Sequence, residues 1–236
     1  MYQIKALTYR YQTEVFPAFD LTIESGEYLA LMGENGSGKS TFLNLLAGFL
    51  TPATGEIWFE GKDLTKWQAN TVQKKKFYSH LGILFQETDS QLFNSTVYDE
   101  IAFGPRQLQL APEEVEQRVN DCLALLKLEP LKKRVPYQLS GGEKKKVAFA
   151  SILAMNPAVY LLDEPFNGLT KETEKLFKQI LKQLQQLGKT IILSSHDYVS
   201  IAHEADAVLL FTDPIKKYST EEITADSTLY QQLINY

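Results

Sequence analysis

The sequence contains one cysteine, Cys122, so no internal disulfide can form. It also lacks a basic excess: 24 Lys and Arg stand against 29 Asp and Glu, which gives a formal net charge of −5. Proteins whose main partner is a nucleic acid usually carry a clustered basic excess, so the composition argues against such a partner. Nucleotides remain possible, because a loop of backbone N–H groups can hold phosphate without net positive charge.

Long apolar runs are missing too. Stretches such as Val147 to Met155 fall well short of the ~20 residues needed to cross a bilayer. The segment Met1 to Lys5 does not begin a basic and then apolar secretory signal. We therefore expect a cytoplasmic protein whose membrane contacts are peripheral. With 236 residues, 44% of them hydrophobic, the chain can bury a sizeable core in one large domain or in a core with an inserted lobe.

Strand and helix patterns alternate along much of the chain, which predicts a parallel sheet of the α/β class. Apolar segments that indicate buried strands lie at Tyr28–Met32, Val159–Leu162 and Thr190–Leu193. The first 23 residues instead have the alternation of antiparallel hairpin strands. From Glu87 to about Leu139 the pattern changes to helices, which suggests an inserted helical lobe.

A glycine-rich segment follows the first buried strand. Gly33-Glu34-Asn35-Gly36-Ser37-Gly38-Lys39-Ser40-Thr41 matches G-x-x-x-x-G-K-[ST] and lies between a strand and a helix start, as that pattern requires. Its glycines let consecutive N–H groups curve around a β-phosphate, where the helix N-terminus adds positive potential. We expect Lys39 to reach the β- and γ-phosphates and Ser40 to ligate Mg²⁺. The predicted nucleotide-binding residues here are Gly33, Asn35, Gly36, Ser37, Gly38, Lys39, Ser40 and Thr41.

Two adjacent carboxylates, Asp163 and Glu164, end the apolar strand that starts at Val159. The carboxyl ends of strands in α/β sheets face the crevice where ligands bind. We expect Asp163 to hold Mg²⁺ through its water shell, and Glu164 to orient and deprotonate an attacking water. An isolated Asp-Glu pair is more often a solvated strand end, but beside a phosphate loop we interpret it as catalytic.

A second loop suited to phosphate is Leu139-Ser140-Gly141-Gly142-Glu143, whose glycines expose N–H groups at the start of a helix. One nucleotide does not need two such loops. Over nearly its whole length the chain resembles the ATP-binding-cassette (ABC) family, whose hallmark is L-S-G-G-Q. The resemblance implies that ATP lies between one subunit's phosphate loop and the signature of a second ATPase subunit. Ser140, Gly141 and Gly142 would then contact the γ-phosphate held by that subunit.

The resemblance also implies the fold: a P-loop NTPase (RecA-like) core with an N-terminal antiparallel β subdomain and an inserted α-helical subdomain. Within a single ATP-binding domain, 1–236, the core and β subdomain would comprise 1–86 and 156–236. The helical subdomain with the signature would comprise 87–155.

Three further positions match family motifs. Tyr11, an aromatic before the phosphate loop, would stack on adenine. Gln86 looks like the glutamine that links Mg²⁺ and water to a membrane subunit, so we count it with Ser40 and Asp163 among the metal residues. His196, in Ser194-Ser195-His196-Asp197, resembles the switch histidine that contacts the γ-phosphate. Glu164, His196 and Gln86 are thus the predicted catalytic residues.

The chain departs from the family pattern at three places. Glu143 stands where Gln is usual, an exchange we expect to alter little. Thr170 replaces the D-loop Asp that helps to couple the two sites across a dimer, which leaves that coupling open. Lys144-Lys145-Lys146 replaces a run that usually contains Gln and Arg. We interpret this run, like Lys74-Lys75-Lys76, as a solvated helix face.

The stretch Phe85–Phe93, followed by Thr96-Val97 and 102–105, resembles the cobalt and energy-coupling-factor ATPases, with Thr88 in place of the usual Pro. Those ATPases import vitamins or transition-metal ions through a transmembrane coupling subunit. The resemblance implies an ATP-hydrolysing subunit at the cytoplasmic face of the membrane, with a membrane subunit docked on the helical subdomain. The second ATPase subunit could be identical or different, and Thr170 would be least harmful in a heterodimer.

Two other functions fit the same motifs. One is the ATPase of an ABC exporter, and the other is a soluble regulatory cassette that binds ATP without productive hydrolysis. Chromosome-structure ATPases are excluded, because no long coiled coil separates the phosphate loop from the signature. Each motif occurs once, which excludes the two-cassette translation factors.

Overall fold

The computed structural model describes residues 1–234 and, within them, every side chain except that of Glu14. Its centre is a six-stranded sheet in the order β10-β9-β3-β8-β7-β6. All neighbours are parallel except β10, which runs antiparallel to β9. The strands are β3 (Tyr28–Met32), β6 (Leu81–Leu84), β7 (Val159–Leu162), β8 (Thr190–Ser194), β9 (Ala207–Leu210) and β10 (Lys216–Ser219). The expected parallel sheet is confirmed, whereas β10 was not predicted.

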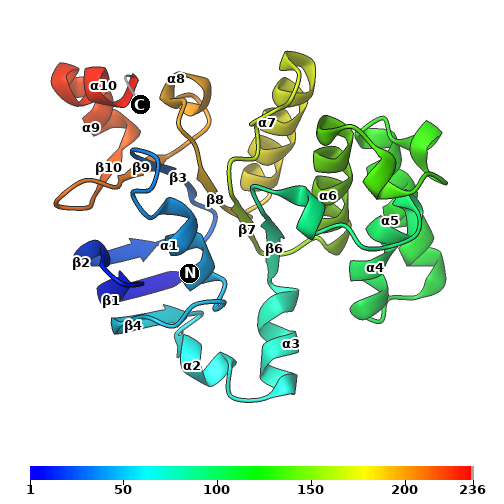
Figure 1. Cartoon of the computed structure of the whole chain (residues 1–236), viewed down its shortest axis with the longest axis horizontal. Helices are drawn as coiled ribbons and strands as arrows, with labels where there is room; N and C mark the ends of the chain where they lie inside the picture. Colours follow the sequence, from blue (N-terminus) through cyan, green and yellow to red (C-terminus); the bar gives the residue numbers. More distant parts are fainter. Residues whose placement is uncertain (235–236) are drawn as a thin grey trace.

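A second, antiparallel sheet has the order β2-β1-β4-β5. Its strands are β1 (Tyr2–Arg10), β2 (Glu14–Ile23), β4 (Thr54–Phe59) and β5 (Lys62–Asp63). Helix α1 (Lys39–Leu46) joins both sheets in one core, because Phe42 packs among residues such as Leu31 of β3 and Ile4 of β1. Figure 1 shows α1 between the two sheets. The N-terminus of α1 is therefore held firmly at the carboxyl end of β3.

Three helices form a lobe at one side of the molecule, drawn in green to olive in Figure 1. They are α4 (Val97–Gln107), α5 (Pro112–Leu125) and α6 (Gly141–Met155). Their apolar faces join the sheet residues on the opposite side of β3 from α1. Cys122 lies in this core as predicted, and burial raises the pKa of its thiol to about 12. At neutral pH that thiol is a protonated packing group.

The remaining helices are α2 (Leu64–Trp67), α3 (Thr71–Ser79), α7 (Lys171–Gln186), α8 (Tyr198–Ile201), α9 (Thr220–Ala225) and α10 (Ser227–Ile234). Three 3₁₀ turns lie at Thr88–Ser90, Glu129–Leu131 and Pro136–Gln138. Lys74, Lys75 and Lys76 are exposed on α3, as expected of a solvated face. Within residues 1–234, no helix has the length and apolar character to span a bilayer.

Candidate active site

The phosphate loop runs from β3 into α1, and Gly38 is required there on two grounds. Its φ of 105° lies in the left-handed region that favours glycine. A Cβ at Gly38 would also come within 2.8 Å of the Phe16 ring and 2.9 Å of the Val15 side chain. Hairpin β1–β2 thus closes over the loop and fixes its path.

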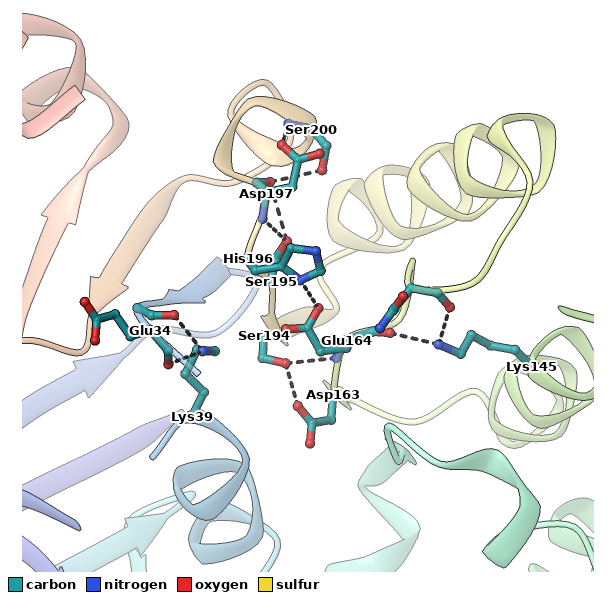
Figure 2. A network of polar contacts seen from close by, with 12 residues as sticks. Glu34, Lys39, Lys145, Asp163, Glu164, Ser194, Ser195, His196, Asp197 and Ser200 are labelled. Carbon is teal, nitrogen blue, oxygen red and sulfur yellow. Dashed lines mark hydrogen bonds and ion pairs between the residues drawn. The ribbon is translucent and has the colours of Figure 1, made fainter. Parts of the chain in front are cut away.

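Lys39 begins α1 and folds back over the loop, where its Nζ donates to Gly33 O at 2.7 Å and to Glu34 O at 2.9 Å (Figure 2). Burial lowers the pKa of Lys39, and the carboxylates of Glu164 and Asp163 oppose that shift. The Oγ of Ser37 is buried without a partner among the described residues. A loop with a buried cation and an unpartnered hydroxyl suits a bound phosphate.

A cleft of about 590 Å³ opens over this loop. Predicted site residues from four parts of the chain line this cleft: Tyr11, the phosphate loop, Gln86 and Glu164. Thr13 and Val15 of the first hairpin also line it, and sequence reasoning missed both. Tyr11, at the outer end, is 64% exposed and lies edge-on against Tyr9, with ring centroids 4.9 Å apart. The lining residues are Tyr11, Thr13, Val15, Asn35, Gly36, Gly38, Lys39, Ser40, Thr41, Gln86 and Glu164.

Asp163 and Glu164 follow β7 at the same edge of the sheet as the phosphate loop. Ser194, at the end of the adjacent strand β8, links them: its Oγ donates to Asp163 Oδ1 at 2.5 Å and accepts from the Glu164 N–H at 2.9 Å. Glu164 has a φ of 46°, a left-handed conformation that is uncommon for a residue with a side chain. Strained backbone of this kind concentrates at active sites.

His196 faces the Glu164 carboxylate across the ends of β7 and β8 (Figure 2). Its Nδ1 lies 3.0 Å from Glu164 Oε2, within hydrogen-bonding distance. The turn around His196 is itself fixed, since the Asp197 N–H donates to Ser195 Oγ at 3.1 Å. Two of the three predicted catalytic residues, Glu164 and His196, are thus in contact.

The signature lies elsewhere in the molecule. Ser140 is exposed at the N-cap of α6, and none of Ser140, Gly141 and Gly142 lines the cleft. Glu143 closes a capping box, accepting from Ser140 N at 2.9 Å and from Ser140 Oγ at 2.7 Å. These hydrogen bonds hold the pKa of the Glu143 carboxyl below its usual range. One copy of the chain therefore carries both loops but does not bring them to one phosphate.

A family model described as ABC transporter matches residues 17–167. The chain belongs to this family. The nickel import ATP-binding protein LarO of Lactiplantibacillus plantarum is 46% identical over 209 residues, which cover 88% of this chain and 84% of that protein. The energy-coupling factor transporter ATP-binding protein EcfA of Methanothermobacter thermautotrophicus is 38% identical over 238 residues, covering 98% and 75%.

Solved structures agree with these relatives. CbiO1 from Clostridium perfringens, part of the ABC transporter complex CbiONQ, aligns with a TM-score of 0.82 at 31% identity, covering 98% of this chain and 93% of that one. The ATP-binding cassette MJ0796, a dimer in a post-hydrolysis state bound to ADP and Pi, aligns with a TM-score of 0.83 at 26% identity, covering 93% and 99%. The chain is an ABC ATPase with the expected P-loop NTPase fold.

The lysine run of this ABC ATPase corrects one prediction: Lys144, Lys145 and Lys146 do not form a solvated face. Lys145 is only 6% exposed, and Lys144 forms an ion pair with Asp89 at 2.6 Å. Consecutive helix residues point about 100° apart, so three in a row cannot all face solvent on a helix that packs on one side. That spacing was the signal that sequence reasoning overlooked.

At the D-loop of the ABC ATPase, Thr170 caps α7 by accepting from the Thr173 N–H at 3.3 Å. Thr and Asp are both good N-cap residues, so the unusual Thr keeps the local structure. Ser194 is a further residue whose role sequence reasoning missed. Its place at the end of a buried strand next to the acidic strand was the available signal.

Proposed function

We propose that this ABC ATPase powers an energy-coupling-factor importer of a vitamin or transition-metal ion from the cytoplasmic face of the membrane. The names of LarO, EcfA and CbiO1 support an importer of this class. The observation that carries the proposal is an aromatic groove whose exposed wall, with Phe85, Phe93 and Phe103, comes from the stretch that resembles the energy-coupling-factor ATPases.

In the proposed reaction, Glu164 accepts a proton from a water that attacks the γ-phosphorus in line, while the bond to the ADP oxygen breaks. His196, held 3.0 Å from Glu164 Oε2, keeps that carboxylate oriented and presents its other nitrogen to the γ-phosphate. Lys39 and the N–H groups of the phosphate loop hold the β- and γ-phosphates. Tyr11 offers its exposed ring to the adenine.

The donor set suits Mg²⁺, which prefers oxygen ligands and keeps several waters. Ser40, Gln86 and Asp163 supply a hydroxyl, an amide and a carboxylate. The described residues hold no cluster of three or more His, Cys, Asp or Glu, so phosphate and water oxygens would complete the coordination. When bound, Mg²⁺ neutralises charge on the β- and γ-phosphate oxygens.

A second ATPase subunit completes the proposed site. Ser140, Gly141 and Gly142 lie outside the cleft of their own chain, and a side chain at Gly141 would meet nothing within 4 Å. The N–H groups of Gly141 and Gly142, in the first turn of α6, suit a phosphate presented by another copy or by a related ATPase. The dimeric state of the MJ0796 cassette with ADP and Pi supports this arrangement.

The groove, of about 250 Å³, lies between the sheet core and the helical lobe, with Gln91 and Glu100 among its polar lining. Phe93 is 67% exposed and stacks edge-on against Phe103 at 4.9 Å between centroids. The side-chain amide of Gln91 accepts from the Phe85 N–H at 3.3 Å and donates to Ile83 O at 2.9 Å. These two hydrogen bonds connect the groove to strand β6 and to the residue before Gln86. A membrane subunit docked here would move together with Gln86.

The test is purification of the chain from detergent-solubilised membranes, with mass spectrometry of its companions and a phosphate-release assay. We expect a transmembrane coupling subunit, a separate substrate-binding membrane protein and ATP turnover. Phe93→Glu should lose the membrane subunits. Leu187→Glu should keep them, because Leu187 is even more exposed than Phe93 but lies outside the groove. A complex that withstands Phe93→Glu, or a chain without membrane companions, would refute the proposal.

A further inference from the structure

The backbone of Glu164 is fixed from both sides. Its N–H donates to Ser194 Oγ at 2.9 Å, and its carbonyl accepts from the Asn167 N–H at 3.3 Å and from Lys145 Nζ at 3.0 Å. Asn167 belongs to the D-loop turn that follows. A non-glycine residue at a φ of 46° keeps this conformation only where its surroundings impose it. Of these partners, Lys145 belongs to the helical lobe, on helix α6.

Lys145 lies in the second turn of α6, the helix that the signature begins. Its Nζ also donates to Asn167 O at 2.7 Å, so one ammonium group joins two carbonyls of the segment that carries the catalytic carboxylate (Figure 2). Next to it, a Cβ at Gly142 would contact Gly168 O at 3.8 Å. The start of α6 and the D-loop thus form one contact region.

We propose that Lys145 is a positioning residue for ATP hydrolysis. It holds the Glu164 and Asn167 carbonyls to the signature helix, so that the Glu164 carboxylate stays aimed at the cleft. When the nucleotide of a partner subunit moves the signature, Lys145 transmits that displacement to Glu164, the proposed catalytic base in the same chain as Lys145. The inference rests on the proposed role of Glu164 as the base.

The surroundings of Lys145 favour a donor over a mere packing residue. Burial lowers the pKa of Lys145, while the Glu164 and Asp163 carboxylates oppose that shift. Its hydrogen-bond acceptors are main-chain carbonyls, so a buried side chain without donors would remove the Lys145 hydrogen bond from Asn167 O and leave Glu164 O only the 3.3 Å bond from the Asn167 N–H. Methionine would fill the space without donating, and glutamine would restore a donor on a shorter stem.

The experiment uses the full chain in its purified transporter complex and compares Lys145→Met, Lys145→Gln and Lys146→Met. Lys146 is the matched control because it follows on the same helix and its charged neighbours are Glu143, Lys127, Glu172 and Glu129. Steady-state phosphate release gives kcat and KM for ATP, and a fluorescent ATP analogue measures binding. Thermal unfolding of each variant is recorded alongside.

We expect Lys145→Met to lower kcat by about 10-fold or more with KM within about 3-fold, because a displaced base costs rate rather than ground-state binding. Lys145→Gln should recover at least about 3-fold of the lost kcat, and Lys146→Met should stay within about 2-fold of the wild type. Unchanged kcat in Lys145→Met, a kcat loss with no recovery in Lys145→Gln, or a rise in KM without a fall in kcat would each overturn the proposal.

Two further arms keep the result decisive. If Lys145→Met does not fold, Lys145→Gln is compared with Lys146→Gln: a lower kcat at unchanged KM supports the proposal, and an equal kcat overturns it. Glu164→Gln is measured in parallel. If Glu164→Gln retains turnover, Glu164 is not the catalytic base. If Glu164→Gln loses turnover but Lys145→Met keeps it, only the positioning role of Lys145 is refuted.

Discussion

Replacement of Ser194 by alanine removes one hydroxyl that serves both acidic residues of the site. Ser194 is fully buried, and its Oγ lies 2.5 Å from Asp163 Oδ1 and 2.9 Å from Glu164 N. The variant leaves the Glu164 N–H without its acceptor and the Asp163 carboxylate without a donor. The methyl group of alanine fits the vacated space, so these two lost hydrogen bonds are the perturbation.

A hydrogen bond to a charged group contributes about 1.5–3 kcal/mol, and an unsatisfied buried donor costs about 1–3 kcal/mol. Because the two bonds share one oxygen, their losses are not independent. We expect the free energy of unfolding to fall by about 2–4 kcal/mol, which for a chain of this size lowers Tm by about 4–16 °C. A released Glu164 backbone should also reduce kcat by about 10- to 100-fold.

Thermal unfolding and phosphate release measure the two effects on the same preparation. Ser79→Ala is the control, because the Ser79 hydroxyl donates only to Lys76 O within the last turn of α3. That change should alter the free energy of unfolding by no more than about 0.5 kcal/mol. If Ser194→Ala matches Ser79→Ala in both Tm and kcat, the account of Ser194 is wrong.

Two other changes test the outer parts of the site. Tyr11→Ala should raise KM for ATP by about 5- to 100-fold through loss of base stacking, whereas Tyr11→Phe keeps the ring and should stay near the wild type; steady-state kinetics decide. Because Ser140 holds the Glu143 pKa below its usual value, the capping box stabilises the fold above about pH 4.3 and loses that contribution as pH falls through the folded pKa. Urea unfolding from about pH 3 to 6 should show this decline relative to Glu143→Gln, which has no such titration, and parallel curves would contradict it.

Local pattern was enough to predict the sheet core and the loop at its edge. Tyr28–Met32 and Val159–Leu162 are strands at the predicted residues, because an uninterrupted apolar run suits a strand that is buried on both faces. The phosphate-loop pattern placed Lys39, the acidic strand end placed Glu164 and the family resemblance placed Gln86, and all three line the same cleft.

What the sequence could not supply depends on contacts between distant segments. Lys145 and Glu164 are 19 residues apart, and only the packing of α6 against the turn after β7 brings them together. Ser194 meets Asp163 because β7 and β8 are neighbours in the sheet, although 31 residues separate them. The helical spacing of the lysines and the position of Ser194 at a strand end indicate burial, but they do not identify these partners.

The short helices α2 and α3 escaped prediction for a different reason. Their starts depend on side-chain caps, with Asp63 accepting from Thr65 N and Asn70 accepting from Gln73 N. Helix α2 is only four residues long, and α3 buries one residue, Phe77, so neither shows a clear apolar periodicity. Capping residues were present in the sequence, but they also occur in ordinary turns.

The most direct test of the account is the turnover of Glu164→Gln in the purified transporter complex, with ATP binding measured on the same sample. Glutamine keeps the size of the side chain but cannot accept the proton of the attacking water. The account predicts phosphate release reduced by about 10²- to 10⁴-fold and ATP affinity within about 3-fold of the wild type. Phosphate release at the wild-type rate would contradict it.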